Sequence, residues 1–158
     1  MKLSSHEEYG LRCLLQVAMQ GSGGTATIPE ISRKEGISMA YVAKLLRILR
    51  QGGLVSAARG KEGGYTLALP PDQIFIAQAL AILGGRLYDD DFCDRHSGIE
   101  HHCLHSTDCS LRSLWRSVQG AVDSVLRTIT LRDLLRSDSD AALIPLHNRP
   151  KRIQPDTN

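Results

Sequence analysis

The sequence predicts a mainly helical protein with one small β-hairpin and a long helix in its C-terminal half. Three observations lead to this fold class. Aromatic residues make up only 4% of the 158 residues while hydrophobic residues reach 42%, so aliphatic helix packing must supply most of the core. Apolar residues recur at helical spacing in several stretches. One short stretch between glycines alternates as a strand does.

The first two helices are indicated by apolar spacing and by capping residues. The first is expected to end before the glycine-rich residues 21–24. A second, short helix begins at Thr27, because Thr27 and Glu30 have the spacing of a capping box and Pro29 suits a first turn. Gly36 is expected to end it. The apolar positions of the first helix recur at i, i+3, i+4 and i+7: Leu11, Leu14, Leu15 and Ala18.

A third helix is predicted directly afterwards, with Ser38 as its N-cap. Two short helices joined by a tight turn that contains glycine define a helix-turn-helix. The apolar face of the third helix must turn toward the core: Val42, Leu45, Leu46 and Leu49. The remaining positions are expected to meet DNA in a major groove, since they combine cations with small and hydrogen-bonding groups. These candidate DNA-binding residues are Ser38, Ala40, Tyr41, Lys44 and Arg47.

A β-hairpin is predicted to follow, with Leu54 and Val55 in its first strand and residues 65–69 in its second. Such a hairpin completes a winged helix-turn-helix. Its tip is basic and rich in glycine, and we expect Arg59 and Lys61 to contact phosphates or a minor groove. Residues 33–62 hold seven basic residues against two acidic ones, as phosphate neutralisation requires.

The C-terminal half is expected to contain a helix capped by Asp72, then a long helix of about five turns. A long helix beside a small winged domain commonly pairs with its copy, so we expect a homodimer. We divide the chain into residues 1–70 (DNA-binding domain), 71–136 (Cys/His loop and dimerisation helix) and 137–158 (disordered tail). The apolar positions of the long helix are Leu111, Leu114, Trp115, Val118, Val122, Val125 and Ile129.

Three of the four cysteines, Cys93, Cys103 and Cys109, lie within 17 residues, together with four of the six histidines. Thiolates at this spacing suit an iron–sulfur cluster or zinc, whereas a disulfide would leave one thiol unpaired. The N-terminus has no apolar run of signal-peptide length, and no stretch predicts a membrane span. We therefore expect a cytoplasmic protein without a membrane partner, in which clustered cysteines are more often metal ligands than disulfides. Cys13, among leucines, is expected to be a buried small hydrophobe.

These features together resemble the bacterial winged-helix iron–sulfur regulators, the family that includes IscR, NsrR and RirA. The resemblance covers residues 1–135. It implies a transcription regulator, not an enzyme, that binds a double-stranded DNA operator as a dimer. It also implies that Cys93, Cys103 and Cys109 hold one [2Fe–2S] or [4Fe–4S] cluster, which senses redox state, nitric oxide or iron and cluster supply. The residues that carry the resemblance are Met1–Ser4, Glu8–Arg12, Ile37–Leu46, Arg59–Leu67 and the three cysteines before Leu114-Trp115.

Two departures from the family pattern leave the fourth ligand open. The spacing from Cys93 to Cys103 is longer than usual and rich in histidine, and Arg112 stands where the IscR branch has a ligating histidine. In the NsrR branch an acidic residue of the first helix, commonly from the other subunit, completes the cluster, and Glu8 occupies the matching place. Other candidates remain: Glu7, His96, His101, His102 and His105.

Two other functions remain open. Cys93, His96, Cys103 and Cys109 could form a tetrahedral zinc site in a zinc-binding regulator. The chain could also be an iron–sulfur electron carrier or cluster donor that does not bind DNA, although the basic third helix and hairpin argue against this. A cysteine-dependent enzyme is disfavoured, because no catalytic spacing lies on a strand-turn-helix scaffold.

Overall fold

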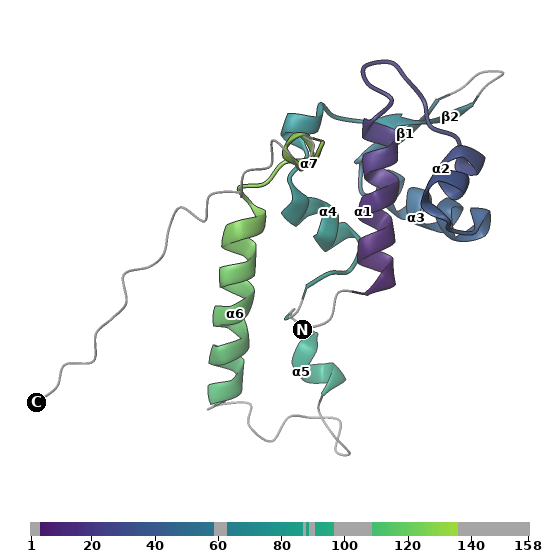
Figure 1. Ribbon diagram of the computed structural model, residues 1–158. Helices are drawn as coiled ribbons and strands as arrows, with labels where there is room; N and C mark the ends of the chain where they lie inside the picture. The colour runs from purple at the N-terminus through teal and green to yellow at the C-terminus, as the bar shows by residue number, and fades with distance from the viewer. Residues whose placement is uncertain (1–3, 59–62, 87, 89–90, 97–108, 136–158) are drawn as a thin grey trace, which may run out of the picture.

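The computed structural model describes residues 4–58, 63–86, 88, 91–96 and 109–135 (Figure 1). Its elements are, in order, α1 (Ser5–Ala18), α2 (Ile28–Glu35), α3 (Met39–Gln51), β1 (Val55–Ala58), β2 (Gly64–Leu67), the 3-10 turn η1 (Pro71–Gln73), α4 (Ile76–Ile82), α5 (Phe92–Arg95), α6 (Ser110–Leu126) and α7 (Leu131–Leu134). In this part of the chain no helix combines the length and the apolar composition that a membrane crossing requires.

The helix-turn-helix is confirmed, and its boundaries follow from the capping residues. Thr27 and Glu30 form the expected capping box at the start of α2. Gly36 ends α2 with φ of 66°, a left-handed conformation that glycine adopts without a steric penalty. The Ser38 side chain then accepts a hydrogen bond from the Tyr41 main-chain N–H and starts α3. The two helices are therefore separated by only a tight turn.

The first helix has a cap that the sequence analysis did not predict. Ser4 and Glu7 form a capping box in which each side chain accepts a hydrogen bond from the main-chain N–H of the other residue. The Ser-x-x-Glu spacing would have revealed it. This cap fixes the first turn of α1 and engages the Glu7 carboxylate.

The β-hairpin is confirmed, with shorter strands than the alternation suggested. Strands β1 and β2 are antiparallel, and the register pairs Val55 with Leu67 and Ala58 with Gly64. Leu54 lies just before β1 and Leu69 just after β2. Ala26 forms an additional bridge to Tyr65 through two main-chain hydrogen bonds of 2.9 and 2.8 Å. The loop before α2 therefore supports the wing from its other side.

The helix that Asp72 was expected to cap is divided in two, and that prediction was wrong. Residues 71–73 form the η1 turn, and α4 begins only after Phe75, with no side-chain cap. The cause is pairing with the chain after α6. The Leu131 N–H donates to the Ile74 carbonyl oxygen (2.8 Å), and the Ile76 N–H donates to the Ile129 carbonyl oxygen (2.9 Å). Ile74 and Phe75 are extended because they make this bridge.

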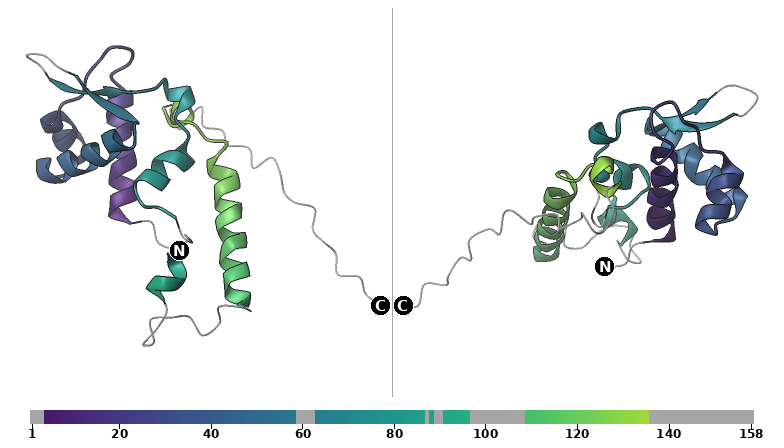
Figure 2. Two further views of the ribbon diagram at one scale, coloured as in Figure 1. Left: turned by 180° about the vertical axis from the view of Figure 1, so that it is seen from behind. Right: turned by 45° about the horizontal axis from the view of Figure 1, so that its top comes forward.

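One hydrophobic core joins the winged elements to the residues that follow α6. Leu14 of α1, Leu45 of α3 and Leu131 of α7 are fully buried in the same cluster, which also contains Ile74 and Ile129. Helix α6 lies on the opposite side of α1 from α2 and α3, next to α4 (Figures 1 and 2). The division at residue 70 stays a prediction, and this core contains residues from both sides of it.

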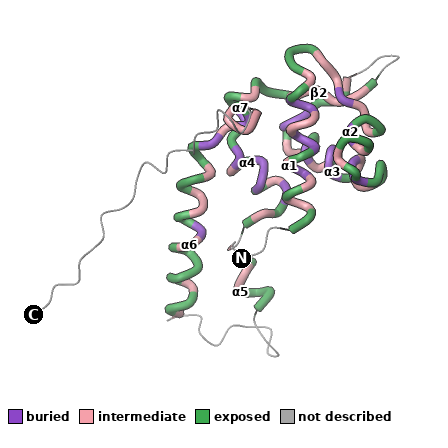
Figure 3. The backbone as a smooth tube through the Cα atoms, in the orientation of Figure 1, coloured by how far each residue is buried: buried purple, intermediate pink, exposed green. Residues whose placement is uncertain are grey.

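Helix α6 is the least covered of the long helices. Its tube in Figure 3 is mostly green and pink, with one buried position. Ile129 belongs to the predicted apolar spacing but lies beyond the end of the helix, where it is buried in the core. Large apolar side chains remain exposed in the single chain, at Leu111, Leu114, Trp115 and Val125.

Replacing Leu131 by alanine should lower the free energy of unfolding by about 2–5 kcal/mol, because the change leaves a cavity in the shared core. Chemical denaturation at one fixed protein concentration measures this. Met19→Ala is the control, since Met19 is an exposed large apolar residue. Equal, small effects of both changes would show that the segment after α6 does not pack into the core.

Candidate nucleic-acid interface and metal centre

The outer face of α3 presents Ala40, Lys44 and Arg47 to solvent. Their outward orientation follows from the apolar stripe on the opposite side of the helix, where Leu45 and Leu49 are fully buried. Ser38 is also exposed, and its hydroxyl oxygen serves as the N-cap acceptor. The helix therefore offers two cations and small groups to a ligand without disturbing the core.

Tyr41 is only half exposed, although the sequence placed it on the outer face. Its ring makes edge-on contacts with the rings of Tyr9 and His6 on α1, at centroid distances of 6.1 and 6.2 Å. Its hydroxyl lies 3.5 Å from His6 Nδ1. Tyr41 thus spans from the start of α3 to α1, and its contact with DNA stays a prediction. Arg59 and Lys61, the candidate residues at the wing tip, lie outside the described residues.

The structure brings two of the three clustered cysteines to one pocket. Cys93 lies on α5, and Cys109 is the residue at the N-terminal boundary of α6. Both are half-buried free thiols, and both line a pocket of about 200 Å³. The other lining residues are Tyr88, Phe92, His96, Leu111, Arg112 and Trp115.

Cys103, His101, His102 and His105 lie outside the described residues. Within the part of the chain that the structure describes, no group of three or more His, Cys, Asp or Glu residues gathers at one point. The pocket nevertheless suits a metal group that thiolates bind, since two soft ligands line it and the third cysteine belongs to the segment that connects α5 to α6.

A guanidinium and a phenol surround Cys93. Arg112 forms a hydrogen bond to the Cys93 side chain, and this contact raises the pKa of Arg112. The Tyr88 hydroxyl lies 3.9 Å from Cys93 Sγ. Partial desolvation and, second, the hydrogen bond between the Tyr88 hydroxyl and Cys93 raise the pKa of Tyr88. Arg112 has donors but no acceptor, so it cannot replace a ligating histidine, but its positive charge lies beside the Cys93 sulfur.

His96 also lines the pocket, with its ring stacked on Phe92 at a centroid distance of 4.3 Å. Its Nδ1 lies 2.7 Å from the Phe92 carbonyl oxygen. If Nδ1 donates its proton there, Nε2 carries the lone pair that a metal requires. The histidine is therefore oriented by its own helix.

Glu8 is an exposed carboxylate on the first turns of α1. Its Oε1 accepts a hydrogen bond from Arg12 Nε at 2.9 Å, and the Glu8 side chain is 47% exposed. Glu8 is not among the residues that line the Cys93 pocket within one chain. The neighbouring Glu7 is occupied as a cap acceptor.

The fourth cysteine, Cys13, is fully buried in the core, as predicted. Burial, followed by the negative charge of Glu35, raises its pKa to about 12. The Cys13 thiol therefore stays neutral at ordinary pH and is a poor metal ligand, because only the thiolate binds metal well.

The sequence analysis missed the polar contact on α6 that holds the segment before α5. Gln119 is buried and accepts a hydrogen bond from the Tyr88 main-chain N–H. A signal was present, since Gln119 lies four residues after Trp115 and three before Val122, on the apolar side of the predicted helix. A polar residue at such a position needs a specific partner.

A winged helix-turn-helix with a long additional helix defines a class of DNA-binding transcription regulators, and the comparisons place this chain in it. Residues 3–137 match the Rrf2 family, described as iron-dependent transcriptional regulators. The chain belongs to this family and is a DNA-binding transcription regulator.

Similar proteins agree with this assignment. The chain is 34% identical to protein rrf2 of Nitratidesulfovibrio vulgaris, over 92% of each sequence. It is 33% identical to the transcriptional regulator IscR of Aliivibrio salmonicida, over 90% of this chain and 88% of that one. Among solved structures, IscR of T. potens has a TM-score of 0.69 at 28% identity and covers 90% of this chain and 92% of its own. CymR, the global cysteine regulator of B. subtilis, has a TM-score of 0.67 at 28% identity, with 85% and 96% covered.

Proposed function

We propose that an iron–sulfur cluster held by Cys93, Cys103 and Cys109 controls the operator binding of this regulator. The observation that carries the proposal is the convergence of Cys93 and Cys109, from two different helices, on one pocket beside Arg112. The description of the family as iron-dependent supports it, as does the likeness to regulators named IscR.

The residues of the pocket fit such a group chemically. Cysteine thiolates are the usual ligands of iron–sulfur clusters. When bound, the cluster supplies an iron centre that reacts with oxidants and small ligands. Arg112 offsets part of the negative charge of the thiolates, and the rings of Phe92 and Trp115 line the pocket with apolar surface. Hydrogen bonds and burial of this kind tune such a centre.

For the fourth ligand we propose the partner subunit's Glu8. Within one chain Glu8 does not line the pocket, but it is exposed, and its ion-pair partner Arg12 is itself at the surface. A second copy of the chain would also bury the exposed apolar residues of α6, as expected at a homodimer interface. The dimer would act in the cytoplasm, where thiols stay reduced.

One observation favours a second candidate, a zinc-binding regulator. The Nδ1 contact of His96 with the Phe92 carbonyl is the kind of hydrogen bond that orients metal-binding histidines, and His96 lines the pocket beside both described thiols. Cys93, His96, Cys103 and Cys109 would then form a closed tetrahedral site. Zinc is d10 and colourless, so visible absorption separates the two candidates.

Replacing Cys93, Cys103 or Cys109 by serine should bleach the anaerobically purified protein, because each change removes one thiolate from the cluster. Visible absorption and iron and sulfide analysis measure this, while far-ultraviolet circular dichroism checks the fold. Cys13→Ala is the control and should keep full colour, since Cys13 lies in the core. Colourless wild-type protein that contains zinc would replace the cluster by the zinc site.

Glu8→Ala belongs to the same experiment and should leave a coloured but more labile cluster. A carboxylate oxygen holds one iron more weakly than a fourth thiolate would, and its loss opens that position. Unchanged spectrum and unchanged sensitivity to oxygen and nitric oxide would transfer the ligand role to a histidine.

Lys44→Ala should weaken binding to all DNA sequences alike and reduce the salt slope of binding by about one, if Lys44 neutralises one phosphate. Gel-shift titrations at several salt concentrations measure the slope. Arg132→Ala is the matched control, because it removes the same charge from α7, across α1 from α3 (Figure 1). Equal losses of DNA affinity in both variants would mean that α3 does not contact the DNA more closely than α7 does.

A further inference from the structure

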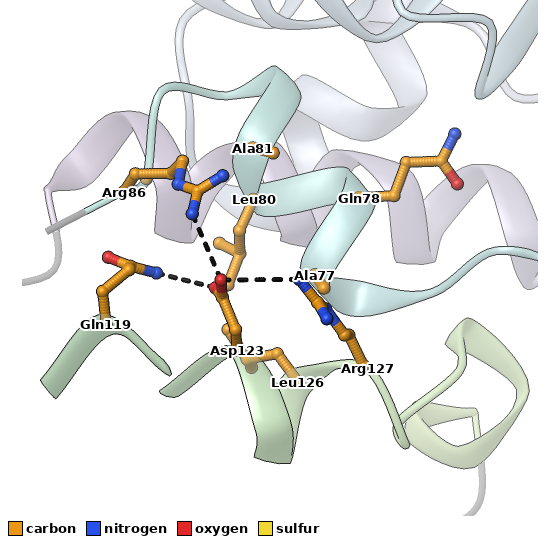
Figure 4. Close-up of a pocket in the computed structure, with 10 residues that line it drawn as sticks. Ala77, Gln78, Leu80, Ala81, Arg86, Gln119, Asp123, Leu126 and Arg127 are labelled. Atoms are coloured by element: carbon orange, nitrogen blue, oxygen red, sulfur yellow. Dashed lines mark hydrogen bonds and ion pairs between the residues drawn. The ribbon is translucent and has the colours of Figure 1, made fainter. Parts of the chain in front are cut away.

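Gln119 is the one buried polar side chain among the residues that the structure describes, with 5% of its surface exposed. Its amide has partners at both ends. Oε1 accepts a hydrogen bond from the Tyr88 main-chain N–H at 3.1 Å. Nε2 donates to Asp123 Oδ1 at 2.7 Å, as Figure 4 shows. A buried amide with both ends paired adds direction to a contact that apolar packing alone leaves unspecified.

Asp123 fixes which way this amide points. The second oxygen of Asp123 forms ion pairs with Arg86 at 3.2 Å and with Arg127 at 3.8 Å (Figure 4). The carboxylate accepts and cannot donate, so the NH₂ group of Gln119 must face it. The carbonyl oxygen of Gln119 is thereby directed at the Tyr88 N–H. A pocket of about 200 Å³ between α4 and α6 is lined in part by Arg86, Gln119, Asp123 and Arg127.

Tyr88 itself lies next to the candidate metal centre. The Tyr88 ring packs on Phe92 of α5 at a centroid distance of 5.1 Å, and its hydroxyl lies 3.9 Å from Cys93 Sγ. Cys109 lies at the N-terminal boundary of α6, the helix that carries Gln119. Gln119 therefore connects the segment that holds one thiol to the helix that begins at the other.

We propose that Gln119 is a positioning residue that holds Cys93 in place relative to Cys109 for binding of the metal group. It does so through the main chain of Tyr88 and touches neither thiol itself. The inference rests on the proposed function, because it assigns a role in assembling the same site. It adds a residue of α6 to those that determine how firmly the cluster is bound. Residues that orient metal ligands in this way strongly affect metal retention.

The test compares cluster retention in the full-length protein. Gln119→Leu removes both hydrogen bonds and keeps an apolar side chain of similar size. It should accelerate the loss of visible absorption in the presence of an iron chelator, under anaerobic conditions, by about tenfold. Ser124→Ala is the matched control on the same helix, because the Ser124 hydroxyl bonds only the Ala121 carbonyl oxygen in the described contacts. It should decay at the wild-type rate.

A charge-exchanged pair gives a readout that general destabilisation would not. In the double variant Gln119→Glu with Asp123→Asn, the new carboxylate can accept a hydrogen bond from the Tyr88 N–H, and the new amide can donate one to that carboxylate. The rate of cluster loss should therefore return to near the wild-type rate. Tyr88→Phe keeps the main-chain N–H and loses only the hydroxyl, so its effect should be smaller than that of Gln119→Leu. An equal effect would assign the role to the hydroxyl and overturn the proposal.

Two further results separate this inference from the proposed function. A wild-type protein without a cluster contradicts the proposed function, whereas a coloured wild type with an equally stable Gln119→Leu cluster contradicts the positioning role alone. If Gln119→Leu does not fold, hydrogen exchange of the wild-type Tyr88 amide decides the matter. Protection well beyond that of a free peptide supports the contact, and exchange at the free-peptide rate overturns it.

Discussion

The pairing of residues 129–131 with residues 74–76 is the contact on which the rest of the arrangement depends. Its two hydrogen bonds end the long helix at a defined place, divide the expected helix after the wing, and put Leu131 into the core that also holds α3. Helix α6 is thereby anchored to the winged domain at its C-terminal end, while Cys109 lies at its other end. A change at the proposed metal centre would have a physical route to the DNA-binding helices, along α6 and through this shared core.

The second constraint is electrostatic and concerns Cys93. Cys93 lies beside Arg112 at a pocket, whereas burial in the core raises the pKa of Cys13 to about 12 and keeps that thiol protonated. The two thiols thus have opposite environments in one chain, because one faces a cation and a pocket and the other is fully buried in the core near the charge of Glu35. The metal binding that we propose belongs to the environment of Cys93, because the neutral thiol of the buried Cys13 is a poor ligand.

The sequence predicted the helix-turn-helix and the hairpin well, because Thr27, Gly36 and Ser38 are local signals and the leucines of α3 mark one face. It failed at Ile74 and Phe75, whose extended conformation is caused by a partner some 55 residues away along the chain that no local pattern reveals. Tyr41 was placed by helical spacing alone, which cannot show that Tyr9 and His6 cover part of its ring. The two described cysteines could be grouped from spacing. The contact of Tyr88 with Cys93 and the contact of Gln119 with Tyr88 could not be predicted, because they depend on how the segment with α5 lies against α6.

The most direct test of the account is the affinity of one operator for the two forms of the protein. An operator fragment obtained by genomic selection can be titrated with cluster-loaded and cluster-free protein, under anaerobic conditions and at a fixed salt concentration, and followed by fluorescence anisotropy. If the metal centre and the DNA-binding helices are coupled, the two dissociation constants should differ by about 5- to 150-fold. Equal dissociation constants, with the cluster intact throughout the titration, would contradict the account.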